Sequence, residues 1–295
     1  MNFNCVPYLT IGTLKRFLIL IRYRKVSKIK YYNIKEKIYH DGKRQVIVYK
    51  DNMIEKNYKR ECNNNNKLII DQLLNKDITV DEYEYKKNVS IIKSHKRALN
   101  NIYDISRCND WDLFVTLTFN PEKVDSFNYD EVSKKLKNWL DKIRRNNKDL
   151  KYIIVPELHK SRRYHFHGLF ANCGNLKLSD SRKFDSKGNK VYNIDSYNLG
   201  WTTATKVKNT DAVNKYIAKY VTKDLFENTM YKKRYWSSRN CNKPKVLEKY
   251  VDANSAIKNL ETSGGLISKQ VKEYTYINSW GEEFTNEVYY FELDS

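Results

Sequence analysis

The chain contains two histidines and one glutamate whose spacing is typical of a metal-binding site. His165 and His167 alternate with aromatic residues in the apolar run 164–170, and this alternation predicts a β-strand. Imidazoles at positions i and i+2 of a strand share one face and lie about 7 Å apart. Glu157 belongs to a second apolar run, and an antiparallel hairpin centred near Ser161 would bring it opposite His165. The sequence therefore predicts that one carboxylate and two imidazoles converge on a metal ion, with other coordination positions open to a substrate.

Two other interpretations of this stretch stay open at the level of sequence. Short motifs recur by chance, so the same pattern also fits two exposed strand histidines and an unrelated glutamate. His159 shares the predicted face by parity, and it is either a neighbour of the ligands or an alternative ligand.

Residues 211–223 predict a helix that carries two tyrosines on one face. Tyr216 and Tyr220 are four residues apart, which is about one helical turn. Lys219 and Lys223 each follow one of these tyrosines by three residues. The alternative is an amphipathic helix whose tyrosines only cover its flank.

Composition and charge indicate a folded protein with an anionic partner. The 295 residues are 40% hydrophobic, which is enough for one or two domains with a substantial core. The formal net charge of +20 favours nucleic acid as the partner, although a basic surface can also serve solubility alone. The 24 tyrosines add aromatic surface on which unpaired bases can stack.

The cysteines and the apolar runs exclude several protein classes. The five cysteines are scattered and form no Cys-x-x-Cys pair, so neither a zinc ribbon nor a disulfide scaffold is indicated. This usage fits a reducing cytoplasm. The apolar run 17–21 is too short to span a bilayer and is followed by Arg22, Arg24 and Lys25, without a signal-peptide cleavage pattern. We therefore expect no membrane segment.

Periodicity and turn signals predict an alternation of strands and helices around these candidate site residues. We expect a hairpin over 30–50 turning at Asp41-Gly42, helix over 78–107 capped by Asp77 or Asp81, a strand over 111–119, a helix over 129–146, a long loop over 172–198 with a turn at 187–189, a strand over 200–207 and a terminal hairpin over 274–291. Residues 114, 116 and 118 are expected on one face of their strand, and residues 113, 115, 117 and 119 on the other.

Three stretches, in this order, resemble the HUH-endonuclease superfamily of rolling-circle replication initiators, of the type found in small single-stranded DNA phages and bacterial plasmids. Residues 114–119 (Phe-Val-Thr-Leu-Thr-Phe) resemble the first motif. His165-Phe166-His167 resembles the metal-binding second motif, and residues 216–223 resemble the third motif in its two-tyrosine form. The resemblance covers about residues 110–240.

This resemblance implies an α+β fold. We expect a central antiparallel sheet of about five strands, ferredoxin- or RRM-like, with helices packed mainly on one face and the tyrosine helix beside the histidine strand. The endonuclease domain is expected over 109–240. A basic N-terminal extension would occupy 1–108, since residues 1–60 carry 15 Lys and Arg against 4 Asp and Glu, and a C-terminal extension would occupy 241–295.

The resemblance also implies a reaction at single-stranded origin DNA in the cytoplasm of a bacterial host. Glu157, His165 and His167 would hold Mg²⁺ or Mn²⁺, which polarises the phosphate at the nick site. Tyr216 or Tyr220 would attack phosphorus and leave a 3′-OH primer, with Lys219 and Lys223 favouring the phenolate or steadying the phosphate. Host replication proteins are further expected partners.

Two other functions share parts of this pattern. A plasmid relaxase or a single-strand transposase would use the same site, but relaxases usually place the tyrosine before the histidines, and here the tyrosines follow. A non-catalytic nucleic-acid-binding protein with an RRM-like sheet would read RNA through exposed aromatics, and its histidines and tyrosines would be dispensable.

Overall fold

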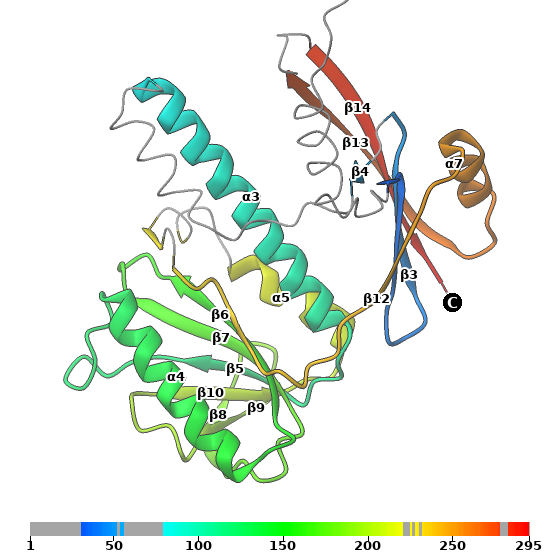
Figure 1. The fold of residues 1–295 in the computed structure, drawn as a ribbon. Coiled ribbons are helices and arrows are strands. Elements are labelled where there is room, and N and C mark those ends of the chain that lie inside the picture. Colours follow the sequence, from blue (N-terminus) through cyan, green and yellow to red (C-terminus); the bar gives the residue numbers. More distant parts are fainter. Residues whose placement is uncertain are drawn as a thin grey trace, which may run out of the picture. The chain divides into compact units, whose positions relative to one another are not determined.

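The computed structural model describes residues 31–51, 54–55, 79–220, 225, 228–229, 232–277 and 283–294 (Figure 1). The chain forms two compact units. The first takes its described residues from the ranges 1–36, 45–63 and 246–294, and the second from 37–44 and 64–245. The predicted domain limits at 108/109 and 240/241 stay predictions.

The second unit is built on a seven-stranded antiparallel sheet with the order β11-β6-β7-β5-β10-β9-β8. Its strands are β5 (Leu113–Leu117), β6 (Lys151–Leu158), β7 (Tyr164–Ala171), β8 (Leu178–Phe184), β9 (Lys190–Ile194), β10 (Thr202–Lys206) and β11 (Trp236–Ser237). The α+β fold with a central antiparallel sheet is confirmed, and the histidine strand β7 lies between β6 and β5 as expected. The sheet is wider than the expected five strands.

Strand alternation divides the side chains of β5 into two faces, as predicted. Leu113, Val115 and Leu117 are almost fully buried, whereas Phe114 and Thr116 are partly exposed on the other face. Directly opposite residues of antiparallel strands share a face. Because Thr116 pairs with His167, the less buried face of β5 is also the face that carries the histidines.

Helix α4 (Tyr129–Asn146) covers the face opposite the histidines, with the predicted bounds. The Asn128 side chain accepts hydrogen bonds from the first-turn amides and caps the helix. Five positions at helical spacing form its buried stripe: Val132, Leu136, Trp139, Leu140 and Ile143. Trp139 packs on Phe170 of β7.

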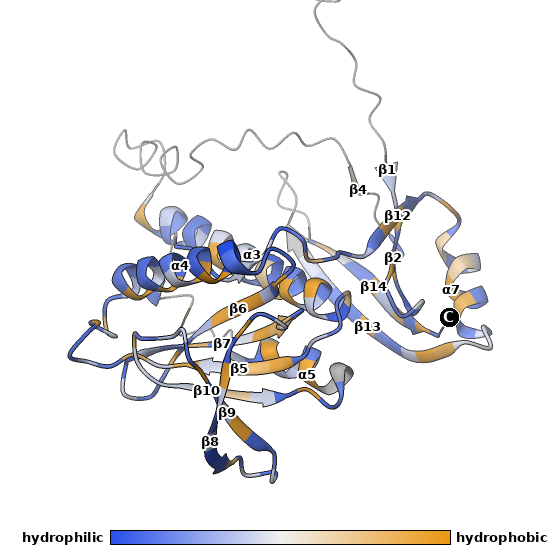
Figure 2. Cartoon of the chain, turned by 90° about the horizontal axis from the view of Figure 1, so that it is seen from below, coloured by the Kyte–Doolittle hydropathy of each residue, from blue (hydrophilic) through white to orange (hydrophobic). Residues whose placement is uncertain are grey.

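Three elements lie on the histidine face of the sheet: helix α3 (Val80–Arg107), helix α5 (Thr210–Ile217) and the 3₁₀ turn η1 (Ala218–Tyr220). Helices therefore cover both faces of the sheet (Figure 1). Figure 2 shows β5 and β6 largely hydrophobic and the outer sides of α3 and α4 largely hydrophilic. The α3 N-cap is Thr79, which forms a capping box with Glu82, so neither Asp77 nor Asp81 caps the helix as predicted. A single 28-residue helix results.

The expected loop over 172–198 is wrong, because this segment contains the hairpin of β8 and β9. Its turn lies at the predicted residues, where Gly188 has a φ of +76° that only glycine adopts readily. The pairing shifts register between Asp180 and Lys183, and Arg182 there has a φ of +58°. This β-bulge breaks the strict alternation by which a strand is recognised in sequence.

The tip of the N-terminal hairpin, residues 37–44, belongs to the second unit and packs on α3. Lys37 Nζ lies 2.8 Å from an Asp104 carboxylate oxygen, and the Tyr39 hydroxyl donates to the same carboxylate. The Arg107 guanidinium lies 3.9 Å from the centre of the Tyr39 ring. The partly buried Asp104 carboxylate therefore has both a counter-ion and a hydrogen-bond donor.

The first unit is a five-stranded sheet with the order β12-β2-β3-β14-β13, with a short ladder of β1 (Tyr31–Tyr32) and β4 (Ile54–Glu55). Its strands are β2 (Ile34–Ile38), β3 (Arg44–Tyr49), β12 (Lys245–Lys249), β13 (Leu266–Ile277) and β14 (Glu283–Leu293). Helix α7 (Ala253–Glu261) packs on it through Ala253 and Ile257. Both predicted terminal hairpins are confirmed, and strands from the two parts of the chain share this sheet. The turn between β13 and β14 lies outside the described residues.

Candidate active site

The β6–β7 hairpin has the register that the sequence predicts. Glu157 pairs with His165, and the turn is closed by backbone hydrogen bonds from the His159 amide to the Arg163 carbonyl and from the Arg162 amide to the His159 carbonyl. Arg162 in this turn has a φ of +66°, a conformation that costs energy in residues other than glycine. The hairpin thus fixes the carboxylate and both histidines of the candidate metal site on one face of two central strands.

Both ring nitrogens of His167 have partners. Its Nε2 lies 2.7 Å from Glu157 Oε2, and its Nδ1 lies 3.1 Å from Thr116 Oγ1. The side chain of His167 is 8% exposed, so these partners replace water. The hydrogen bond to His167 is the largest cause that lowers the pKa of Glu157, followed in the same direction by electrostatic interactions with His167 and His165. Glu157 is therefore held as a carboxylate.

His165 lies beside a third histidine. Its ring stacks on that of His159 with 5.1 Å between the ring centres, and Ser161 holds the Nδ1 of His159 through its backbone amide and hydroxyl. Burial lowers the pKa of His165, and the neighbouring His159 lowers it further. A lowered pKa keeps the imidazole neutral, which is the form that binds metals.

The donor set suits a divalent ion, although no group of three His, Cys, Asp or Glu side chains converges in metal-binding geometry among the described residues. The His167 Nε2 and Glu157 Oε2 atoms are 2.7 Å apart. Adjacent ligands of an octahedral ion with bonds of about 2.1 Å lie roughly 3 Å apart. The two atoms are thus close to the separation that an ion between them requires, and His165 faces the same side.

Helix α5 and the turn η1 bring the two tyrosines together over β5 and β7. The rings of Tyr216 and Tyr220 are perpendicular, with centres 5.3 Å apart, and both contact Phe114. The ring of Tyr220 stacks on that of His167, with centres 3.5 Å apart and planes within 13°. The predicted helix ends at Ile217, and the tighter 3₁₀ turn carries Tyr220.

The surroundings of the tyrosines differ. Burial raises the pKa of Tyr220, and so do its hydrogen bond with Tyr216 and the negative charge of Glu157. Tyr216 is 43% exposed, and the Lys219 Nζ lies 5.6 Å from the centre of its ring. Lys223 lies outside the described residues. The structure thus brings Glu157, His167 and Tyr220 into direct contact and places Lys219 beside Tyr216.

Thr116 and Phe114 are site residues that sequence reasoning did not select. Thr116 holds the second nitrogen of His167, and Phe114 packs against His167 and both tyrosines. A signal was present, because both residues lie in the first motif on the less apolar face of their strand. The pattern of β5 alone does not show which residues that face contacts, since these partners come from β7, α5 and η1.

Comparison with known families gives one match. Residues 112–225 match the family model described as Replication-associated protein ORF2/G2-P. No curated protein and no solved structure matches the chain significantly. The matched segment runs from the start of β5 past the tyrosine turn, and so contains every candidate site residue named above. In the part of the chain that the structure describes, no helix is long and apolar enough to cross a membrane.

Proposed function

We propose that this chain, whose residues 112–225 match the Replication-associated protein ORF2/G2-P family, nicks and rejoins single-stranded DNA at a replication origin. The family is one of rolling-circle replication initiators of small single-stranded DNA replicons, so the chain is a replication-associated protein that acts on origin DNA. The nicking chemistry, the metal and the roles of individual residues are the proposal.

The reaction is a transesterification at one phosphodiester. The phenol oxygen of Tyr216 or Tyr220 forms a bond to phosphorus, and the bond from phosphorus to the 3′ oxygen breaks. The phenol loses its proton, and the leaving oxygen gains one. The products are a 5′-phosphotyrosine and a free 3′-OH, which host replication proteins extend. Attack by a 3′-OH on the phosphotyrosine reverses the step and rejoins the strand, so no ATP is consumed.

Glu157, His165 and His167 are the residues that would hold Mg²⁺ or Mn²⁺. When bound, such an ion stabilises the charge that develops on the phosphate oxygens. With an ion at Nε2, the Thr116 hydroxyl, 3.1 Å from Nδ1, would accept the Nδ1 proton of His167 and fix the tautomer whose Nε2 lone pair binds the ion. Glu157 supplies the negative charge that a hard cation prefers.

The observation that carries the proposal is the contact between the candidate nucleophile and the candidate metal ligands. Tyr220 stacks on His167 at 3.5 Å, and His167 bonds Glu157 at 2.7 Å. The raised pKa of Tyr220 keeps its phenol protonated at rest. A cation beside the oxygen favours the phenolate, so nucleophile and metal site depend on each other.

Covalent capture tests the proposal. Single-stranded oligonucleotides that cover the replicon encoding the chain are incubated with the protein and Mn²⁺, and SDS-resistant adducts are resolved on a gel. We expect an adduct with Mn²⁺, none with EDTA, and none in the His165→Ala or His167→Ala variants, which should still bind DNA. Full cleavage in EDTA would refute the metal-dependent mechanism.

The tyrosine variants assign the nucleophile. We expect Tyr216→Phe and Tyr220→Phe each to retain single-turnover cleavage, and the double variant to form no adduct. Tyr250→Phe is the matched control, because Tyr250 is 62% exposed and lies outside the segment that carries Tyr216 and Tyr220. Peptide mapping of the adduct identifies the attacking residue, and an adduct outside 216–220 would overturn the assignment.

A further inference from the structure

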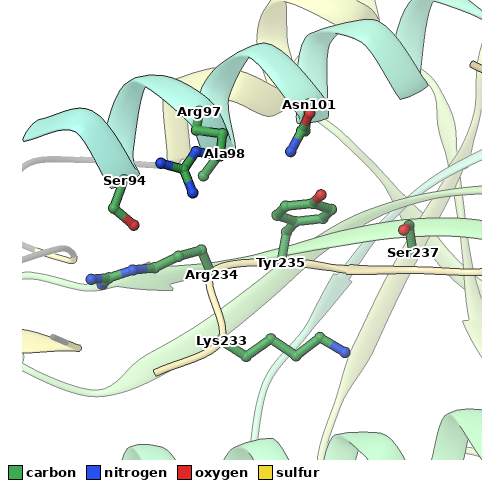
Figure 3. A pocket seen from close by; sticks show the side chains of 8 residues that line it. All are labelled: Ser94, Arg97, Ala98, Asn101, Lys233, Arg234, Tyr235 and Ser237. Atoms are coloured by element: carbon green, nitrogen blue, oxygen red, sulfur yellow. The ribbon is translucent and has the colours of Figure 1, made fainter. Parts of the chain in front are cut away.

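A cleft of about 370 Å³ lies between α3 and the strand segment that includes β11. Ser94, Arg97 and Asn101 line it from α3, and Arg234, Tyr235 and Ser237 line it from the strand segment. Figure 3 shows the side chains of Ser94, Arg97 and Asn101 extending from α3 towards the strand segment that carries Arg234 and Tyr235. The Lys233 side chain extends on the side of the strand segment away from α3, and its Nζ lies 5.4 Å from the centre of the Trp236 ring.

The cleft is built for an anion. Its lining contains arginines from both walls and no carboxylate. Arg97 is exposed and can move to a ligand, whereas Arg234 is half-buried and donates to the Thr229 hydroxyl, which fixes its guanidinium. Arginine presents a planar set of donors that matches the geometry of a phosphate group. A fixed and a movable arginine on facing walls are a suitable pair for one phosphate.

An aromatic ring lines the same cleft as these cations. Tyr235 is partly buried against the core, so one side of its ring is supported and its direction is set. Aromatic rings beside cations bind unpaired nucleotides, because bases stack on the ring while the cations contact the backbone. The volume of about 370 Å³ is near the lower end for pockets that bury a small organic ligand. It suits one nucleotide unit and is too small for a duplex.

The cleft opens on the same face of the sheet as the candidate active site. Ser237 pairs with Ile153, and Ile153 pairs with Leu169, which shares its strand face with His165 and His167. Two strand spacings separate β11 from β7, or roughly 10 Å. Four residues along β6, roughly 13 Å, separate Ile153 from Glu157. A stretch of a few nucleotides is long enough to reach across this diagonal.

We propose that this cleft binds one nucleotide of the single-stranded DNA that flanks the scissile phosphodiester. Arg97 and Arg234 contact its phosphate, and Tyr235 stacks on its base. The inference rests on the proposed function for the identity of the strand, but it uses none of the residues of the cleavage site.

Binding of a fluorescein-labelled oligothymidylate, followed by anisotropy in EDTA over a range of salt concentrations, tests the proposal without cleavage. Arg97→Ala should weaken binding at low salt and reduce the slope of log K against log salt by about 0.7, the value for one lost phosphate contact on a single strand. Tyr235→Leu should weaken binding by about 5- to 150-fold and leave the slope unchanged, since it removes stacking. Tyr235→Phe should bind as the unchanged protein does.

Lys96→Ala is the matched control, because it removes one positive charge from an exposed position of α3 that does not line the cleft. It should leave affinity and slope nearly unchanged. Equal effects of Arg97→Ala and Lys96→Ala would mean that only the general charge matters, and unchanged binding by Tyr235→Leu would remove the stacking site; either result overturns the proposal. Competition by dTTP as strong as that by the oligonucleotide would reassign the cleft to free nucleotides.

The same assay separates the two proposals. The Tyr216→Phe/Tyr220→Phe double variant should bind the oligonucleotide normally while forming no adduct. If the unchanged protein forms no adduct but the Arg97 and Tyr235 effects hold, the cleft stands and the nicking reaction falls. If adducts form and the Arg97 and Tyr235 effects are absent, the nicking reaction stands and the nucleotide-binding role of the cleft falls.

Discussion

Replacement of Thr116 by valine tests whether the second nitrogen of His167 is part of the metal site. The change removes one hydroxyl and nearly preserves the volume of the side chain. That hydroxyl lies 3.1 Å from His167 Nδ1, and the imidazole is only 8% exposed, so water does not easily replace it. The expected effect is therefore on the orientation and tautomer of the imidazole rather than on packing.

Two independent estimates give the size of the effect. Loss of the partner that orients a metal-binding histidine typically lowers metal affinity 10- to 100-fold, or about 1.4 to 2.8 kcal/mol. A buried donor left without an acceptor costs about 1 to 3 kcal/mol. Both ranges agree, and we expect Thr116→Val to bind Mn²⁺ about 30-fold more weakly.

Isothermal titration of Mn²⁺ into the protein measures this change. Thr203→Val is the control, because Thr203 is exposed and pairs with Thr116 on the adjacent strand β10. At saturating Mn²⁺ the cleavage rate of Thr116→Val should recover, since the hydroxyl positions a ligand and does not touch DNA. Unchanged Mn²⁺ affinity in Thr116→Val, or an equal loss in Thr203→Val, would refute the reasoning.

Three further predictions concern stability and reactivity. Leu136→Ala, at a fully buried position of α4, should lower the free energy of unfolding by about 2 to 5 kcal/mol in denaturant titrations. Asp104→Ala should lower it by about 3 kcal/mol because Lys37 is left buried without its counter-ion, whereas Asp110→Ala at an exposed position should be nearly neutral. Burial raises the pKa of Cys108 to about 11, so iodoacetamide at pH 8 should leave this thiol unmodified in the folded protein and alkylate it after unfolding, as peptide mass spectrometry can show.

Sequence patterns were sufficient to predict the features that are determined by residues close together in the chain. The bounds of α4 follow from the spacing of its apolar residues and from Asn128 as its cap. The pairing of Glu157 with His165 follows from a short turn between two apolar runs. Each of these features is determined within about twenty residues of sequence, where period and turn chemistry are informative.

Long-range contacts and irregular backbone were not predictable in this way. The strand β8 is polar, and its bulge at Arg182 breaks the period of two, so the segment looked like a loop. The stack of Tyr220 on His167 joins residues from two distant elements, and the 3₁₀ turn that aims Tyr220 has no sequence signature of its own. The role of Thr116 depends on β5 lying beside β7, which only the sheet order reveals.

The five-stranded sheet combines strands from both ends of the described chain, and this determines which sheet can fold first during synthesis. The hairpin of β2 and β3 leaves the ribosome early, but its neighbours on both sides, β12 and β14, come from residues 245–293. At about 5 to 20 residues per second, the fifty or so residues from 245 to 293 take roughly 2 to 10 s to make. The seven-stranded sheet, whose last strand ends at Ser237, therefore has time to fold while both edges of the early hairpin still lack partners. We expect that chains whose synthesis stalls in this interval would pair with one another through the exposed edges of the β2–β3 hairpin.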